Sequence, residues 1–219
     1  MTIQLFAHPF SSYCMKVLIA LYERDVPFEL KLLSSDQPEN GAAFARLWPM
    51  QHMPLLLDGE AAVRESSIII EHLDLYHGAA LPMVPRDAKQ ALRVRFLDRV
   101  FDNYVMTPMQ RIVFDFIRST ETRDPTGVAA ARALLERAYA WLDSELPRAG
   151  WANGVAFGLA DCASASALLY ADWVHAIPDI CANLHSYRRR LLARPSVARV
   201  VDEARPYRHL FPPGAPTRD

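Results

Sequence analysis

The chain has 219 residues and carries 24 Lys and Arg against 25 Asp and Glu, for a formal net charge of −1. This balance excludes a general electrostatic attraction to nucleic acids or anionic membranes. The first residues lack the basic region and long apolar core of a signal peptide, and no apolar run reaches the roughly 18–20 residues of a membrane span. We therefore expect a cytoplasmic protein with one large domain or two small ones.

The cysteines and histidines show no pattern typical of a metal site. Cys14, Cys162 and Cys181 lie far apart without a CxxC pair, and the seven histidines show no HxxxH or comparable cluster. An odd number of widely spaced cysteines is not a disulfide framework. We expect a reducing compartment and no bound metal.

Residues 3–21 carry the strongest functional signal. The apolar alternation over residues 3–7 predicts a short strand, and the apolar spacing from residue 15 onward predicts a helix. Pro9 lies between them and predicts a turn, because proline fixes its own φ and pushes the preceding residue out of the helical region. Ser11 and Ser12 therefore open the helix.

Serine at a helix start has two interpretations. Its side-chain oxygen usually accepts from a free backbone N–H and caps the helix. The same helix end also attracts an anion, because of its free N–H groups and the positive end of its dipole, and a hydroxyl there can donate to a bound thiolate. Lowering a thiol pKa from ~8.5 by ~2 units takes roughly 2.7 kcal/mol, which one charge-assisted hydrogen bond and a helix terminus can supply.

The remainder of the first 80 residues predicts further short elements. These are a strand at residues 28–32, a short irregular helix at 42–47, and a hairpin formed by 53–57 and 61–63 around Asp58-Gly59. Glu65, Ser66 and Ser67 then open a helix that ends near residue 78.

The pattern becomes purely helical after that helix. Residues 81–87 contain two prolines and predict a linker. Pro108 is expected to kink or end one of the following helices, and residues 160–173 are apolar on nearly every side, as expected of a buried central helix. The order predicts an α/β domain (βαβαββα) at residues 1–80 and an all-α domain at residues 88–219, with an interdomain cleft.

The order and spacing of these motifs resemble the cytosolic glutathione transferase family over the whole chain. Ser11-Ser12-Tyr13-Cys14 follows the first strand, Met53-Pro54 precedes the hairpin, and Glu65-Ser66 begins a helix, all ahead of a helical domain. The first of these motifs also aligns with the CPYC of glutaredoxins, so that Ser11 stands where their nucleophilic cysteine stands. The resemblance implies a thioredoxin-like first domain and a bacterial, serine-type transferase.

The resemblance also implies roles for individual residues. Ser11 is the first candidate for the hydroxyl that activates the glutathione thiol, and Ser12 is the second. Met53 would offer its backbone N–H and C=O to the cysteinyl part of glutathione, next to a cis peptide bond at Pro54. At the γ-glutamyl end, the residues implied are Ser66 for the carboxylate and Glu65 for the amino group.

Two residues before the Met-Pro pair are further candidate contacts. His52 stands where many relatives carry lysine for the glycyl carboxylate. A neutral imidazole brings no fixed charge near pH 7, so glutathione affinity is expected to depend on pH. Gln51 is a neighbouring polar candidate.

The acceptor pocket implied by the resemblance draws on Tyr104, Met109 and Tyr170, although aromatic and Met residues at helical spacing are also typical of the core. Asp161, three residues after Gly158, matches the buried capping box of the family and is expected to be structural. Cys14 is expected to be a small buried side chain without a redox role.

The function implied is that of a glutathione transferase in detoxification. Glutathione would be the co-substrate, its thiolate would attack a small hydrophobic electrophile, and the chain would form a homodimer. Three alternatives remain open: a glutathione-dependent cis–trans isomerase of zeta type, a peroxidase, and a partner-binding protein without catalysis. Tyr13 weakens the isomerase alternative, because zeta-type relatives carry a cysteine at that place in their serine-serine-cysteine motif.

Overall fold

The computed structural model describes residues 2–78 and 81–219. Its N-terminal part is a four-stranded mixed sheet in the order β2-β1-β3-β4, in which β1 runs parallel to β2 and antiparallel to β3. The strands are β1 (Ile3–Ala7), β2 (Phe28–Leu32), β3 (Leu55–Asp58) and β4 (Ala61–Arg64). Three helices complete this part: α1 (Ser12–Glu23), α2 (Pro38–Leu47) and α3 (Ser66–Tyr76).

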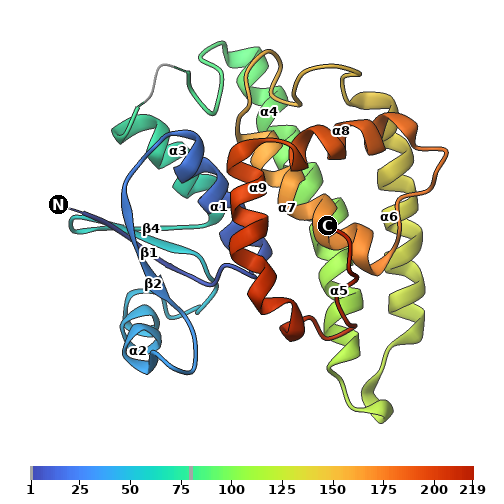
Figure 1. Ribbon diagram of the computed structural model, residues 1–219, viewed down its shortest axis with the longest axis horizontal. Coiled ribbons are helices and arrows are strands. Elements are labelled where there is room, and N and C mark those ends of the chain that lie inside the picture. The colour runs from blue at the N-terminus through green and yellow to red at the C-terminus, as the bar shows by residue number, and fades with distance from the viewer. Residues whose placement is uncertain (1, 79–80) are drawn as a thin grey trace.

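The two faces of the sheet are covered by different helices (Figure 1). Alternate residues of β1 point to opposite faces. Leu5 lies in the large core with α1 and α3, whereas Phe6 packs against Phe44 of α2 in a small separate core. The predicted α/β architecture is therefore confirmed, and it holds the amino end of α1 at the edge of the sheet where β1 ends.

The C-terminal part is helical. Its elements are α4 (Ala88–Val100), the π-helix η1 (Phe101–Met106), α5 (Thr107–Phe116), the 3-10 helix η2 (Thr120–Thr122), α6 (Pro125–Glu145), α7 (Leu159–Val174), α8 (Ala182–Leu192), α9 (Pro195–Ala204) and the 3-10 helix η3 (Arg205–Leu210). The predicted all-α arrangement of this part is confirmed. No helix within the described ranges is both long and apolar enough to cross a bilayer.

Helix α7 is the central helix that the apolar pattern predicted. Every residue from Leu159 to Asp172 is buried, and the helix packs against α1, α4 and η1. Asp161 accepts hydrogen bonds from the backbone N–H groups of Ala152, Asn153 and Gly158, at 2.7, 3.2 and 3.1 Å. Its carboxylate thus closes a loop onto the helix start, which confirms the structural role.

One local prediction needs correction, and one of the two alternatives for Pro108 is excluded. Helix α2 begins at Pro38 rather than near residue 42, because proline is well suited to the first helical turn, where its missing N–H has no intrahelical partner. Pro108 does not end a helix: it lies in the first turn of α5, directly after the π-helical turn. The predicted domain boundary at residue 80 adjoins residues 79–80, which are outside the described residues.

Candidate active site

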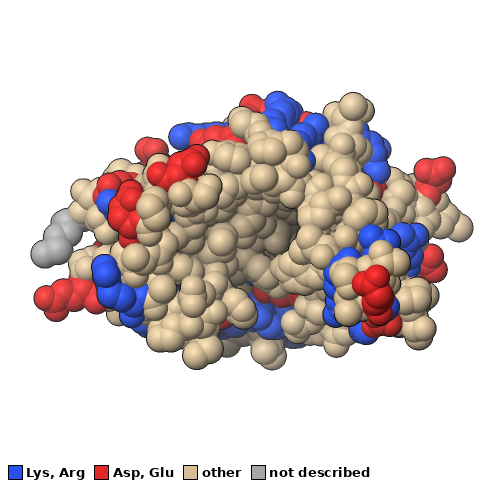
Figure 2. Space-filling view, turned by 90° about the horizontal axis from the view of Figure 1, so that it is seen from below, with Lys and Arg blue, Asp and Glu red and all other residues tan. Residues whose placement is uncertain are grey.

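A cleft of about 770 Å³ lies between the sheet-containing part and the helices. It opens on a hollowed face of the molecule that is surrounded mostly by uncharged residues (Figure 2). Ten of the eleven candidate site residues line it: Ser11, Ser12, Gln51, His52, Met53, Pro54, Glu65, Ser66, Met109 and Tyr170. Residues from three separate loops and from the helical part thus meet at one cavity.

The amino end of α1 faces this cleft. Ser11 is the N-cap residue, with extended backbone dihedrals, yet its side chain makes no capping hydrogen bond. It is half-buried, whereas Ser12 is buried with 8% of its surface exposed. The Ser11 hydroxyl thus lies at a helix end that favours negative charge and does not cap that helix.

Cys14 lies one turn further into the same helix and is fully buried. Burial raises the pKa of its thiol to about 11, although hydrogen bonds from the Ser11 side chain and the His8 backbone act in the opposite direction. A thiol with this pKa stays protonated at neutral pH and is a poor nucleophile. Cys14 therefore behaves as the small buried side chain that was expected.

The Met53–Pro54 peptide bond is cis, as the resemblance implied. Pro54 is buried immediately before β3, while Met53 is half-buried beside it. Gln51 has a positive φ of 52° and, like His52, is exposed at the cleft rim. Residues 51–54 thus form one edge of the cavity, directly before the start of β3.

Glu65 and Ser66, at the start of α3, form another polar part of the cleft lining. Glu65 is the N-cap of α3 and has a φ of 68°, a left-handed conformation that is uncommon for residues other than glycine. Such strain persists where the surrounding structure enforces it, often at binding sites. Ser66 is buried at the first turn of α3, so its backbone and hydroxyl lie where an anion is favoured.

The helical part supplies a mostly apolar side of the cleft. Tyr170 is buried, and its hydroxyl donates to the Phe10 carbonyl at 2.8 Å. The phenol is therefore hydrogen-bonded to the loop that follows β1. Its ring packs edge-on against the Phe10 ring, with the two centroids 5.5 Å apart. Met109 is also buried and lines the cleft from α5.

The structure corrects the expectation for Tyr104, which does not line this cleft. Its side chain is 50% exposed and lines a different groove of about 270 Å³ with residues of α4 and α6, among them Phe96 and Trp141. Tyr104 lies inside η1, where the chain winds with more residues per turn than an α-helix. The π-helical turn rotates the following side chains relative to an ideal α-helical register.

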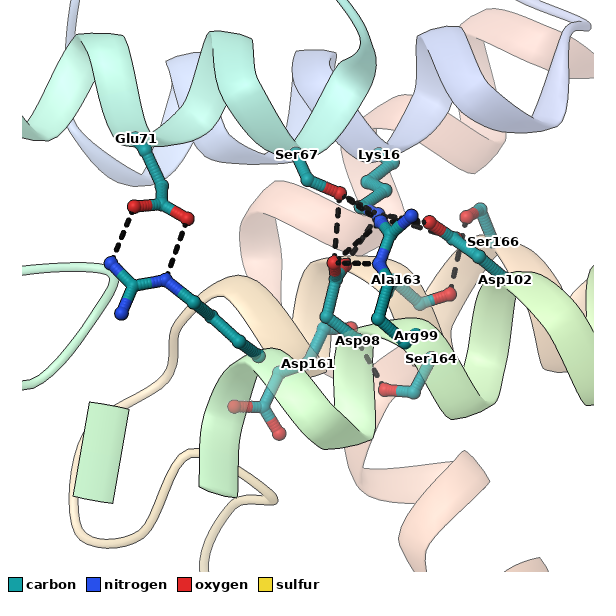
Figure 3. Close-up of polar contacts among 11 residues, drawn as sticks. Lys16, Ser67, Glu71, Asp98, Arg99, Asp102, Asp161, Ala163, Ser164 and Ser166 are labelled. Carbon is teal, nitrogen blue, oxygen red and sulfur yellow. Dashed lines mark hydrogen bonds and ion pairs between the residues drawn. The ribbon is translucent and has the colours of Figure 1, made fainter. Parts of the chain in front are cut away.

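A buried ionic network joins the start of α3 to α1, α4 and η1 (Figure 3). Lys16 is fully buried, and its ammonium lies 2.5 Å from an Asp98 oxygen and 3.0 Å from an Asp102 oxygen. It also donates to the Ser67 hydroxyl at 2.9 Å. Arg99 contacts the same serine at 2.5 Å and Asp102 at 2.6 Å.

The network balances two positive against two negative side chains and joins α1, α3, α4 and η1. Burial opposes ionisation of Asp98, but Lys16 and Arg99 hold its pKa below the ordinary value. Because Ser67 follows Ser66 directly, the network fixes the start of α3 at the cleft. Arg99 and Asp102 also line the cavity.

Sequence reasoning missed this network and part of the lining. The missed lining residues include Phe10, Tyr13, Val113, Phe114, Ile117, Leu210 and Phe211. One signal for the network was present: Lys16 is the charged residue in the apolar part of α1, residues 14–21. A lysine in such a position is rarely buried without a partner.

Comparison with known proteins agrees with this geometry. Residues 5–80 match the family model described as the glutathione S-transferase N-terminal domain. Over 204 residues the chain is 24% identical to a stringent starvation protein A homologue of Coxiella burnetii, covering 91% of each chain. Over 163 residues it is 28% identical to glutathione S-transferase 1 of Dianthus caryophyllus, covering 72% of each.

The structure is also similar to solved glutathione S-transferases. One from Methylobacterium radiotolerans, in complex with glutathione sulfonate, superposes with a TM-score of 0.79 at 28% identity, covering 92% of this chain and 95% of that one. The family model thus matches the N-terminal part of the chain, and the structural similarity extends over both the sheet-containing part and the helical part.

Proposed function

We propose that this protein is a serine-type glutathione transferase in which Ser11 stabilises the glutathione thiolate. One observation carries the proposal: Ser11 faces the cleft from the amino end of α1 without making a capping bond of its own. Its hydroxyl can therefore donate to a sulfur anion, with the helix terminus adding favourable electrostatics.

Residues around the sulfur position give glutathione its orientation. The backbone of Met53, beside the cis bond, would pair with the cysteinyl part of the tripeptide, and Ser66 at the start of α3 would receive the γ-glutamyl carboxylate. Glu65 would pair with the amino group, while His52 and Gln51 lie at the rim for the glycyl end. The glutathione sulfonate complex of a similar transferase supports this choice of ligand.

The chemical step needs no strong base. Glutathione enters as the thiol, its proton leaves to solvent, and Ser11 donates a hydrogen bond to the resulting thiolate. The thiolate then attacks an electrophilic carbon of an acceptor held against the apolar side of the cleft, and the leaving group departs with the bonding electron pair. Fixed donors aimed at the anion lower the barrier because they need no reorganisation during the reaction.

The decisive experiment measures the thiol pKa of bound glutathione by ultraviolet titration in the wild type, Ser11→Ala and Ser12→Ala. We expect the wild type to lower that pKa and Ser11→Ala to restore it toward ~8.5, with a loss of about 10²-fold in kcat toward an aryl halide. Ser35→Ala, in an exposed loop, is the matched control and should change neither quantity.

Two outcomes would contradict the proposal. If calorimetry with millimolar glutathione gave no heat, the binding assignment would fail. If Ser12→Ala alone abolished the pKa shift, Ser12 would be the activating hydroxyl and the assignment to Ser11 would be wrong.

A second candidate function is partner binding without catalysis. The similarity to a stringent starvation protein A homologue over 91% of the chain favours it, since that name denotes no transfer reaction. Retention of Ser11, Pro54, Glu65 and Ser66 in one cleft favours catalysis. Glutathione binding with no turnover of aryl halides, enediones or peroxides would support the partner-binding function.

The proposal extends to a cytoplasmic homodimer. Three free, buried cysteines suit a reducing compartment. Exposed apolar side chains on α3, α4 and η1, including Ile68, Leu92, Phe96 and Tyr104, offer a surface that a second copy would cover. Sedimentation velocity distinguishes the dimer from a monomer.

A further inference from the structure

A cluster of two histidines and one aspartate lies at the other end of α3. Asp58 ends β3, His72 lies on α3, and His77 is the residue that caps its carboxyl end. Both imidazole Nε2 atoms contact the same Asp58 oxygen, His72 at 3.0 Å and His77 at 2.6 Å. Within residues 2–78 and 81–219, this is the single group of three metal-binding side chains whose ligand atoms all lie within 4.8 Å of one another.

We propose that Asp58, His72 and His77 bind a divalent transition-metal ion, with Zn²⁺ as the best fit. Imidazole nitrogen and carboxylate oxygen are ligands that Zn²⁺ prefers, at about 2.0–2.2 Å. In a tetrahedral site of that size, neighbouring ligand atoms stand about 3.3 Å apart. The His72 nitrogen is 3.0 Å and the His77 nitrogen 2.6 Å from the aspartate oxygen, so the cluster must open, mainly at His77, to admit the ion.

The surroundings hold the three side chains in place. Asp58 is the last residue of a strand that pairs with β1 and β4, and Leu73, next to His72, is fully buried in the core. The His72 ring packs on the Tyr76 ring with centroids 4.6 Å apart. Ligands that are fixed before binding lose little conformational freedom when the ion arrives.

The exposure of the cluster suits an ion that enters from solvent. The side chains of His72, Asp58 and His77 are 13%, 21% and 29% exposed. Three protein ligands leave the fourth tetrahedral position to a water molecule. The aspartate gives the site a negative charge that would offset part of the charge of the ion.

The site is separate from the cleft, because none of its three residues lines that cavity. It would tie the β3–β4 hairpin to the carboxyl end of α3, whose amino end carries Glu65 and Ser66. We therefore expect the ion to stabilise the α/β part of the molecule and to leave the chemistry of the cleft unchanged. The proposal does not depend on glutathione binding.

The test uses the full chain after treatment with a chelator. Titration with CoCl₂ should give the visible absorption of a low-symmetry Co²⁺ site at one ion per chain, and ZnCl₂ should displace it. Zn²⁺ should raise the midpoint of thermal unfolding, because an ion that binds only the folded state stabilises it. His72→Ala, His77→Ala and Asp58→Asn should each weaken Zn²⁺ binding by at least about ten-fold.

His175→Ala is the matched control. The Nε2 atom of His175 lies 3.1 Å from a carboxylate oxygen of Glu136, and this pair contains one histidine instead of two. It should leave the stoichiometry and affinity unchanged. Where a variant unfolds, shifts of the His72 and His77 ring resonances in wild-type protein on addition of Zn²⁺ answer the same question. An absence of Zn²⁺ binding, or binding that leaves both rings unperturbed, would overturn the proposal.

Discussion

The side of the cleft supplied by the α/β part is polar, whereas the side supplied by α5, α7 and the C-terminal segment is mostly apolar. The first side presents hydroxyls, backbone and charged groups from residues 11–12, 51–54 and 65–66. The second presents side chains such as Met109, Val113, Phe114 and Phe211. The contrast indicates two binding tasks in one cavity: a charged, hydrogen-bonding ligand on one side and a hydrophobic one on the other.

The ionic network around Lys16 connects these two sides, so removing it should have the largest effect. Lys16→Met leaves Asp98 and Asp102 buried with only Arg99 to balance them. Loss of one partner from a buried pair typically costs about 3–5 kcal/mol, so we expect the free energy of unfolding to fall by about that amount. Urea denaturation measures this change.

Lys31→Met is the control for charge removal, because Lys31 pairs with Glu29 at the surface of the same domain. The urea concentration at which the Lys31→Met variant is half unfolded should stay close to that of the wild type. Equal destabilisation by both substitutions would mean that Lys16 stabilises the fold no more than a surface ion pair does.

The polar side was predictable from the sequence because its signals are local. Ser11 follows a strand and a proline turn, Met53-Pro54 precedes a hairpin, and Glu65-Ser66 begins a helix. Each motif specifies its own backbone geometry within a few residues. Their meeting point then follows from the thioredoxin-like order of strands.

The apolar side and the ionic network were less predictable because they depend on how distant elements meet. Nothing near Asp98 or Asp102 indicates that Lys16, more than 80 residues away, lies between them. The resemblance implied Tyr104 for the acceptor pocket, but Tyr104 lies in a π-helical turn and lines a different groove, which no local pattern indicated. The cluster of Asp58, His72 and His77 was not predictable for the same reason. The end of a strand and the end of a helix approach each other only in the folded protein.

The second prediction tests whether acceptor binding and glutathione binding depend on different sides of the cleft. Phe114 is 56% exposed and lines the cleft, so Phe114→Ala should remove apolar contact with the acceptor and little stability. A loss of about 1 kcal/mol of apolar burial raises the KM for a hydrophobic acceptor by about 3- to 10-fold. The Kd of glutathione should not change. Steady-state kinetics and calorimetry measure the two quantities.

Phe116→Ala is the matched control on the same helix. Phe116 is 51% exposed but does not line the cleft, so its removal should leave both quantities unchanged. A change in glutathione affinity with Phe114→Ala would show that the two sides do not act independently.

The last prediction concerns Tyr13, whose phenol also lines the cleft. Burial, followed by the charge of Asp102, raises the pKa of Tyr13 to about 12, and Arg99 and Glu65 also act on the phenol. The phenol therefore keeps its proton between about pH 6 and 9. Tyr13→Phe should leave the pH profile of kcat/KM unchanged and weaken glutathione binding by at most about ten-fold, the value of one hydrogen bond. If the midpoint of that profile rose by a full unit, about 1.4 kcal/mol, Tyr13 would be a donor to the sulfur and the polar side would be organised around it instead of Ser11.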